Sequence, residues 1–151
     1  MRTFVLAAFL VVVAVVPARA EGERGAFGVG IIAGRPTGVT GLYRMSDRTA
    51  IDLDVGLDVF DDNDLYIGAD FLFILPNLLG GGSVGLSPYL GPGAFFVAVG
   101  DGVFGLRVPF GLSLDFTKAP LQLFLELAPI LVLVPNADLD IGGAVGFRYY
   151  F

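Results

Sequence analysis

Three arginines and eight carboxylates fall at positions that share one face of the predicted strands. Paired carboxylates can act as general acid and base, as in glycoside hydrolysis, but no feature of the sequence marks a cleft around them. The chain has no His and no Cys, which disfavours imidazole-based triads and excludes thiolate metal sites and disulfides. The favoured interpretation is a structural set of ion pairs without catalysis, formed by Arg44, Arg107, Arg148, Asp52, Asp54, Asp58, Asp70, Asp115, Glu126, Asp138 and Asp140.

Two ion pairs can be predicted from the turns. A hairpin centred on residues 47 and 48 places Arg44 opposite Asp52, and Arg107 lies on the strand next to that of Glu126. Replacing Glu126 with Leu should then cost about 3–5 kcal/mol, because it leaves a buried charge unpaired. The charge network predicted to stabilise the interior consists of Arg44, Asp52, Asp54, Asp70, Arg107, Glu126 and Arg148.

Two loops that could suggest a bound ion or cofactor do not carry the full motifs. The acidic turn at 61–64 lacks the spaced ligands, the central Gly and the closing Glu of a helix-flanked calcium loop. The glycine run at 80–82 is not followed by Lys and Ser or Thr, as a phosphate-binding loop would be. We therefore predict no cofactor and no metal site.

The elements that position these residues are β-strands, because apolar and polar residues alternate with a period of two. The last stretch, from Asp138 to Phe151, and the third strand, from Ile51 to Val59, show the pattern most clearly. Pro88 and Pro92 predict bulges in the fifth strand, since proline cannot donate to a ladder. Eight strands are predicted, at 25–33, 39–45, 51–59, 65–75, 86–99, 103–116, 121–128 and 138–151.

The fold follows from the high apolar content. Hydrophobic residues make up 55% of the chain, together with 22 Gly, yet the best candidate for a membrane helix, 121–134, is broken by Pro129 and contains Glu126. An even number of strands near ten residues long suits a closed sheet in lipid. We predict an all-β fold, an eight-stranded antiparallel up-and-down transmembrane β-barrel whose narrow interior is filled by side chains.

The N-terminus predicts export. A basic start, an apolar run from Phe4 to Val16 and the small-x-small site at 18–20 are typical of a cleaved signal peptide at 1–20; the run is short for a membrane anchor. The barrel domain would then span 21–151. Without Arg2 and Arg19 this part carries seven basic and fifteen acidic side chains, a formal charge of −8, which disfavours nucleic acid as a partner.

Three segments carry a resemblance: GVGIIAGRPTGVTGLYRMSDRTAIDLDVG (28–56), LRVPFGLSLDF (106–116) and APLQLFLELAPILVLVPNADLDIGGAVGFRYYF (119–151). They resemble an uncharacterised family of bacterial outer-membrane proteins, known from spirochaetes among others, whose members look like small OmpX/OmpA-type eight-stranded barrels. The resemblance implies location in the cell outer membrane, surface exposure, contact with outer-membrane lipid and the barrel-assembly machinery, and a C-terminal insertion signal at Phe151. It also implies extracellular or host macromolecules as candidate partners, and it supplies no catalytic residue.

The function predicted on these grounds is a non-enzymatic structural or surface-interaction role in the outer membrane. One alternative is a narrow conduit for cations or small solutes with an acidic interior. Another is a soluble secreted barrel that binds apolar ligands. With both termini periplasmic, the outward turns would be 34–37, 60–64, 100–102 and 134–137.

Overall fold

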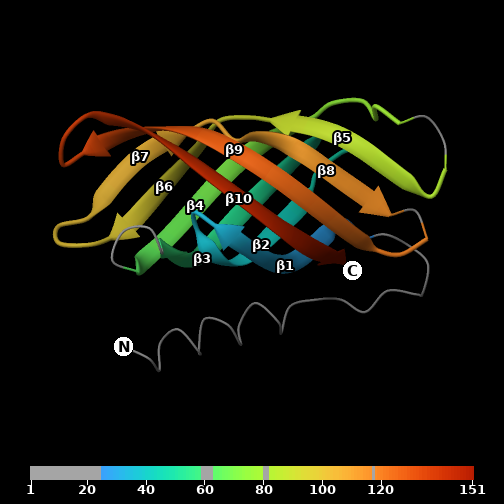
Figure 1. Cartoon of the computed structure of the whole chain (residues 1–151), viewed down its shortest axis with the longest axis horizontal. Coiled ribbons are helices and arrows are strands. Elements are labelled where there is room, and N and C mark those ends of the chain that lie inside the picture. Colours follow the sequence, from blue (N-terminus) through green and yellow to red (C-terminus); the bar gives the residue numbers. More distant parts are fainter. Residues whose placement is uncertain (1–24, 59–62, 80–81, 117) are drawn as a thin grey trace, which may run out of the picture.

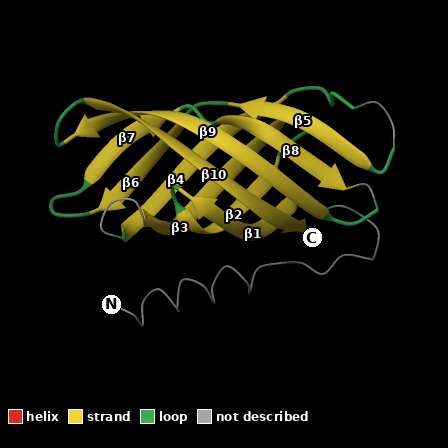
Figure 2. Cartoon of the chain, in the orientation of Figure 1, coloured by secondary structure: helices red, strands yellow, loops and turns green. Residues whose placement is uncertain are grey.

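The computed structural model describes residues 25–58, 63–79, 82–116 and 118–151, and all regular structure within them is β (Figure 2). Ten strands form one antiparallel sheet. They are β1 (Phe27–Gly34), β2 (Thr37–Arg44), β3 (Thr49–Asp58), β4 (Asp64–Ile74), β5 (Val84–Leu90), β6 (Gly93–Ala98), β7 (Val103–Arg107), β8 (Phe110–Phe116), β9 (Leu121–Val134) and β10 (Asp138–Tyr150). The predicted signal peptide lies outside the described residues, as do residues 61 and 62 of the acidic turn.

The strand pairings form a closed circuit, which we call the ring. Strands β1 to β4 pair in sequence, β4 pairs with both β5 and β6, and β9 pairs with β7, β8 and β10. The last strand, β10, pairs with β9 on one side and with β1 on the other, which completes the circuit. Figure 1 shows the strands running obliquely, with β9 and β10 crossing in front of β4 and β6.

The ten strands occupy eight positions in the ring. Along β4, Leu90 of β5 pairs with Phe73 and Gly93 of β6 pairs with Asp70, so both strands keep one register. Strands β7 and β8 likewise share a register along β9. The sequence predicts the fifth and sixth strands as single elements, whereas the structure divides each of them into two. Pro88, predicted to disturb the fifth strand, stays within β5.

The break between β5 and β6 lies at Pro92, and the break between β7 and β8 lies at Pro109. These two prolines and Pro129 of β9 form a row across neighbouring strands. Proline has no N–H to donate to the ladder. The ladder is continued across this row by single hydrogen bonds, from Gly91 N to Pro109 O and from Val108 N to Pro129 O, each 3.1 Å long. The wall of the ring is therefore interrupted at one level.

The period-two pattern separates an outer apolar face from an inner mixed face, as predicted. On β9 the outward leucines are exposed and the residues between them are buried. The predicted outward residues Leu121, Leu123, Leu125 and Leu127 are all exposed, and the predicted inward residues Gln122, Phe124, Glu126 and Ala128 are all buried. None of the described residues forms a helix long and apolar enough to cross a bilayer.

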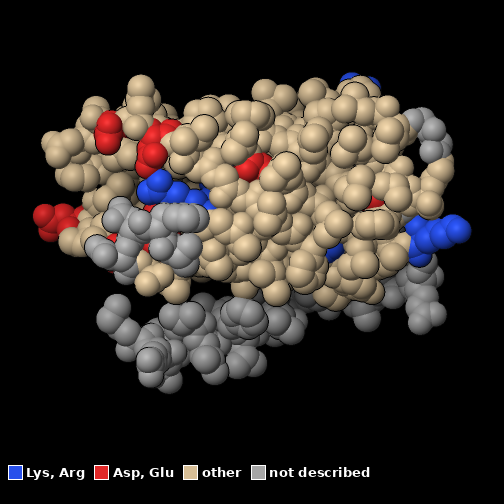
Figure 3. Space-filling view, in the orientation of Figure 1, with Lys and Arg blue, Asp and Glu red and all other residues tan. Residues whose placement is uncertain are grey.

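Charged side chains lie mostly inside the ring or at its ends. The face seen in Figure 3 is largely uncharged along its length, and acidic atoms gather at the end on the left, where β6 turns into β7 and β9 into β10. Inside, two apolar clusters share the space with buried charged residues. This interior is where the candidate site lies.

Candidate functional site

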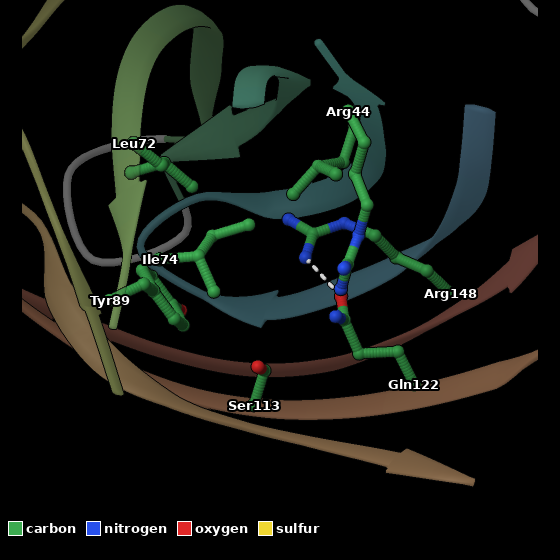
Figure 4. Close-up of a pocket in the computed structure, with 8 residues that line it drawn as sticks. Arg44, Leu72, Ile74, Tyr89, Ser113, Gln122 and Arg148 are labelled. Carbon is green, nitrogen blue, oxygen red and sulfur yellow. Dashed lines mark hydrogen bonds between the residues drawn. The ribbon is translucent and has the colours of Figure 1, made fainter. Parts of the chain in front are cut away.

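Arg148 of β10 is the largest of the fully buried side chains among the described residues, at 1% exposed. Its guanidinium donates to Asp52 of β3 at 2.8 Å, to the Thr40 hydroxyl of β2 at 2.8 and 3.2 Å, and to the Gln122 amide oxygen of β9 at 3.0 Å. It also lies 4.0 Å from the centre of the Phe124 ring. Figure 4 shows Arg148 and Gln122 meeting beside Arg44. Arg148 therefore ties together four separate strands.

A second group forms around Arg107, the last residue of β7. Its guanidinium binds Glu126 of β9, donates to the Tyr66 hydroxyl at 2.9 Å and lies 3.2 Å from an oxygen of Asp70. The Tyr89 hydroxyl donates to the other oxygen of Glu126 at 2.9 Å. The predicted pair of Arg107 and Glu126 is thus confirmed, and it belongs to a larger set of hydrogen bonds.

Smaller ion pairs lie nearer the two ends of the ring. Between β1 and β2, Arg35 donates to Asp58 at 3.0 Å and to Asp140 at 2.6 Å. Partial burial acts to lower the pKa of Arg35, but the hydrogen bonds to Asp140 and Asp58 outweigh it, so the pKa is raised. At the other end Arg44 lies 3.5 Å from Asp115. We call the four arginines Arg35, Arg44, Arg107 and Arg148, together with the side chains that they contact, the interior network.

The predicted pair of Arg44 and Asp52 is wrong. The β2–β3 hairpin places Leu42 opposite Asp52 and Ala50 opposite Arg44, so the register differs by two residues from the predicted one. The hairpin turns around residue 47, and Arg44 N bonds instead to Ala26 O on β1's side. As a result Asp52 pairs with Arg148.

Asp138 and Asp140 lie on the predicted inward side of β10, since Asp140 pairs with the buried Ile130 of β9, but they lie at the start of the strand and are not buried. Both are exposed, together with Leu139 and Ile141, because β10 begins at the end of the ring and its first residues lack a filled interior beside them. Asp140 still contacts Arg35 from this exposed position. Asp58, in contrast, is buried as predicted.

The remaining predicted residues are where the alternation placed them. Asp54 and Asp70 are buried inward from β3 and β4. Phe151 follows β10, its N–H donates to Phe27 O at 2.8 Å, and its ring meets Tyr149 edge to face. Sequence reasoning did not include Thr40, Tyr66, Tyr89, Gln122 or Arg35 in the network, although the inward positions of the first four are visible in the period-two pattern.

Beside this network the described residues border a small cavity. This cavity, bordered by Arg44, Ser113 and Gln122, has a volume of about 10 Å³ (Figure 4), close to the smallest space that holds one water molecule. Glu126, the best-placed carboxylate for acid–base work, is bound by both Arg107 and Tyr89. This arrangement is suited to holding strands together.

Comparison of the chain with protein-family models, with curated proteins and with solved structures found no match. The resemblance to small outer-membrane proteins therefore stays a prediction.

Proposed function

We propose that this protein is a non-enzymatic outer-membrane β-barrel with a structural or surface-interaction role. The observation that carries the proposal is an inverted distribution of side chains: the ring exposes its large apolar residues and buries its ion pairs. A protein surrounded by water rarely exposes apolar patches larger than a few hundred square ångströms. A closed ring surrounded by lipid needs this arrangement, in which backbone N–H and C=O groups bond between neighbouring strands and apolar side chains face outward.

The aromatic residues near the chain termini support the same proposal. Tyr43 and Tyr149 are both exposed at the end of the ring where β10 finishes. Tyr43 pairs across strands with Phe27, and Tyr149 packs against Phe151. Tyrosine is enriched at membrane–water interfaces because its ring is apolar and its hydroxyl can hydrate. We infer that these residues mark one edge of the membrane-embedded belt, with Phe151 at the position of the assembly signal.

The first test is electrophoretic mobility in SDS with and without boiling, after refolding in detergent. We expect the unboiled protein to migrate as a separate band from the boiled one, because a closed ring resists SDS and stays compact. The boiled sample is the matched control. Identical mobility, together with monodisperse refolding in the absence of detergent, would contradict the proposal and favour the soluble secreted protein.

The alternative function is a narrow conduit for cations, and one observation favours it: the interior and its ends hold more carboxylates than arginines. Against it, Arg107 and Arg148 cross the interior and bind residues on several strands. We therefore expect no reproducible conductance steps when the protein is added to planar bilayers. Regular cation-selective steps would reverse this preference.

A further inference from the structure

Three aspartates from neighbouring strands meet in the middle of the interior network. One oxygen of each of Asp52, Asp54 and Asp70 lies within 4.8 Å of the others, and all three side chains are buried. Asp52 and Asp70 are also direct cross-strand partners between β3 and β4. Like charges opposite one another destabilise a sheet, so this arrangement needs positive charge close by.

Two of the three aspartates have such a partner. Asp52 accepts from Arg148 and from the Thr40 hydroxyl, and Asp70 lies beside Arg107. Asp54 is different: it is 1% exposed, and although Thr40 is its hydrogen-bonding neighbour and the charge of Arg148 acts on it from a distance, its Oδ1 has no hydrogen-bond partner and no arginine of the described residues forms an ion pair with it. A buried carboxylate oxygen without a hydrogen bond or a paired cation is unfavourable. This oxygen therefore points to a further positive group, one that residues 25–58, 63–79, 82–116 and 118–151 do not supply.

The local charge balance gives the charge of that positive group. The centre of the interior holds four carboxylates, on Asp52, Asp54, Asp70 and Glu126, against the two guanidinium groups of Arg107 and Arg148. Two negative charges remain. One divalent cation would balance them.

We propose that Asp52, Asp54 and Asp70 form a binding site for one calcium ion. The donors are all oxygen atoms, which suits a hard cation. Calcium bonds to oxygen at about 2.3–2.6 Å in flexible geometry, so one ion can reach oxygens up to the observed 4.8 Å apart. Magnesium needs shorter bonds in near-ideal octahedral geometry and usually keeps several waters, which fits this enclosed position less well. The ion would join β3 to β4 where their side chains repel.

The test is to refold the protein in CaCl2 or in EDTA and to measure calcium bound per protein by equilibrium dialysis. For the natural chain we expect saturable binding of one calcium and a higher melting temperature in calcium than in EDTA. Asp54→Asn keeps the shape of the side chain and removes its charge, and should lower calcium affinity at least tenfold. Asp140→Asn, which removes one acid at the exposed start of β10, should bind as the natural chain does.

The result that would overturn the proposal is the absence of saturable calcium binding by the natural chain, which needs no variant to fold. Equal binding by Asp54→Asn would also overturn it, because calcium would then sit on the exposed acidic end. A melting temperature of the natural chain that is the same in calcium and in EDTA would show that Asp54 is neutralised by a proton instead.

Discussion

Arg107→Met should lower the free energy of unfolding by about 3–5 kcal/mol, because removing one partner of a buried ion pair leaves uncompensated charge. Here two carboxylates, on Asp70 and Glu126, lose their cation at once, and the Tyr66 hydroxyl loses its donor. Methionine fills a similar volume, so the loss reports on charge more than on packing. The measurement is a urea titration of the refolded protein, followed by the fraction that migrates as the folded band.

The control is Arg48→Met, since Arg48 is exposed in the β2–β3 turn and such substitutions usually change stability by no more than about 0.5 kcal/mol. Glu126→Leu completes a comparison within the network. It should cost less than the value of about 3–5 kcal/mol expected from the sequence alone, and less than Arg107→Met, because Arg107 would still have Asp70. If Arg107→Met were as stable as the natural chain, the interior network would not stabilise the ring.

Leu125→Arg is expected to cost about 2–4 kcal/mol in phospholipid vesicles, which is typical of a cation near the middle of a lipid-facing strand. Leu125 lies near the middle of β9, between Leu112 of β8 and Val145 of β10, and its side chain is 55% exposed. In a protein surrounded by water the same substitution would be close to neutral or would improve solubility. The sign and size of the effect therefore report on what surrounds the ring.

Leu139→Arg is the matched control for this prediction. Leu139 is still more exposed but lies at the start of β10, outside the proposed membrane-embedded belt. A cation near the membrane interface costs only about 0–1 kcal/mol. Unfolding in urea should separate the two variants in vesicles. Equal stability of Leu125→Arg and Leu139→Arg would contradict a membrane-embedded belt.

Local pattern was sufficient to predict most of the fold. The alternation on β9 places Leu125 outside and Glu126 inside without reference to any other strand, and the same holds for Asp54 on β3. The proline row was only partly predicted, because a break at Pro109 depends on how β7 and β8 lie along β9.

The ion-pair partners were predicted less well than the strands, because a partner depends on how one strand is placed against another. The pair of Arg44 and Asp52 failed because a shift of the turn by one residue moves the partner by two. The contact of Arg148 with Asp52 spans 96 residues and crosses the interior, so it exists only once the ring has closed. Nothing in the spacing of either residue along the chain encodes it.

The row of prolines lies at the same level of the ring as Arg107. The β6–β7 hairpin begins and ends at the level where Pro92, Pro109 and Pro129 interrupt the backbone ladder. Arg107 lies at the base of this hairpin and reaches Asp70 on one neighbouring strand and Glu126 on the other. Its side chain therefore joins the neighbouring strands by charge at the level where the main-chain ladder is interrupted.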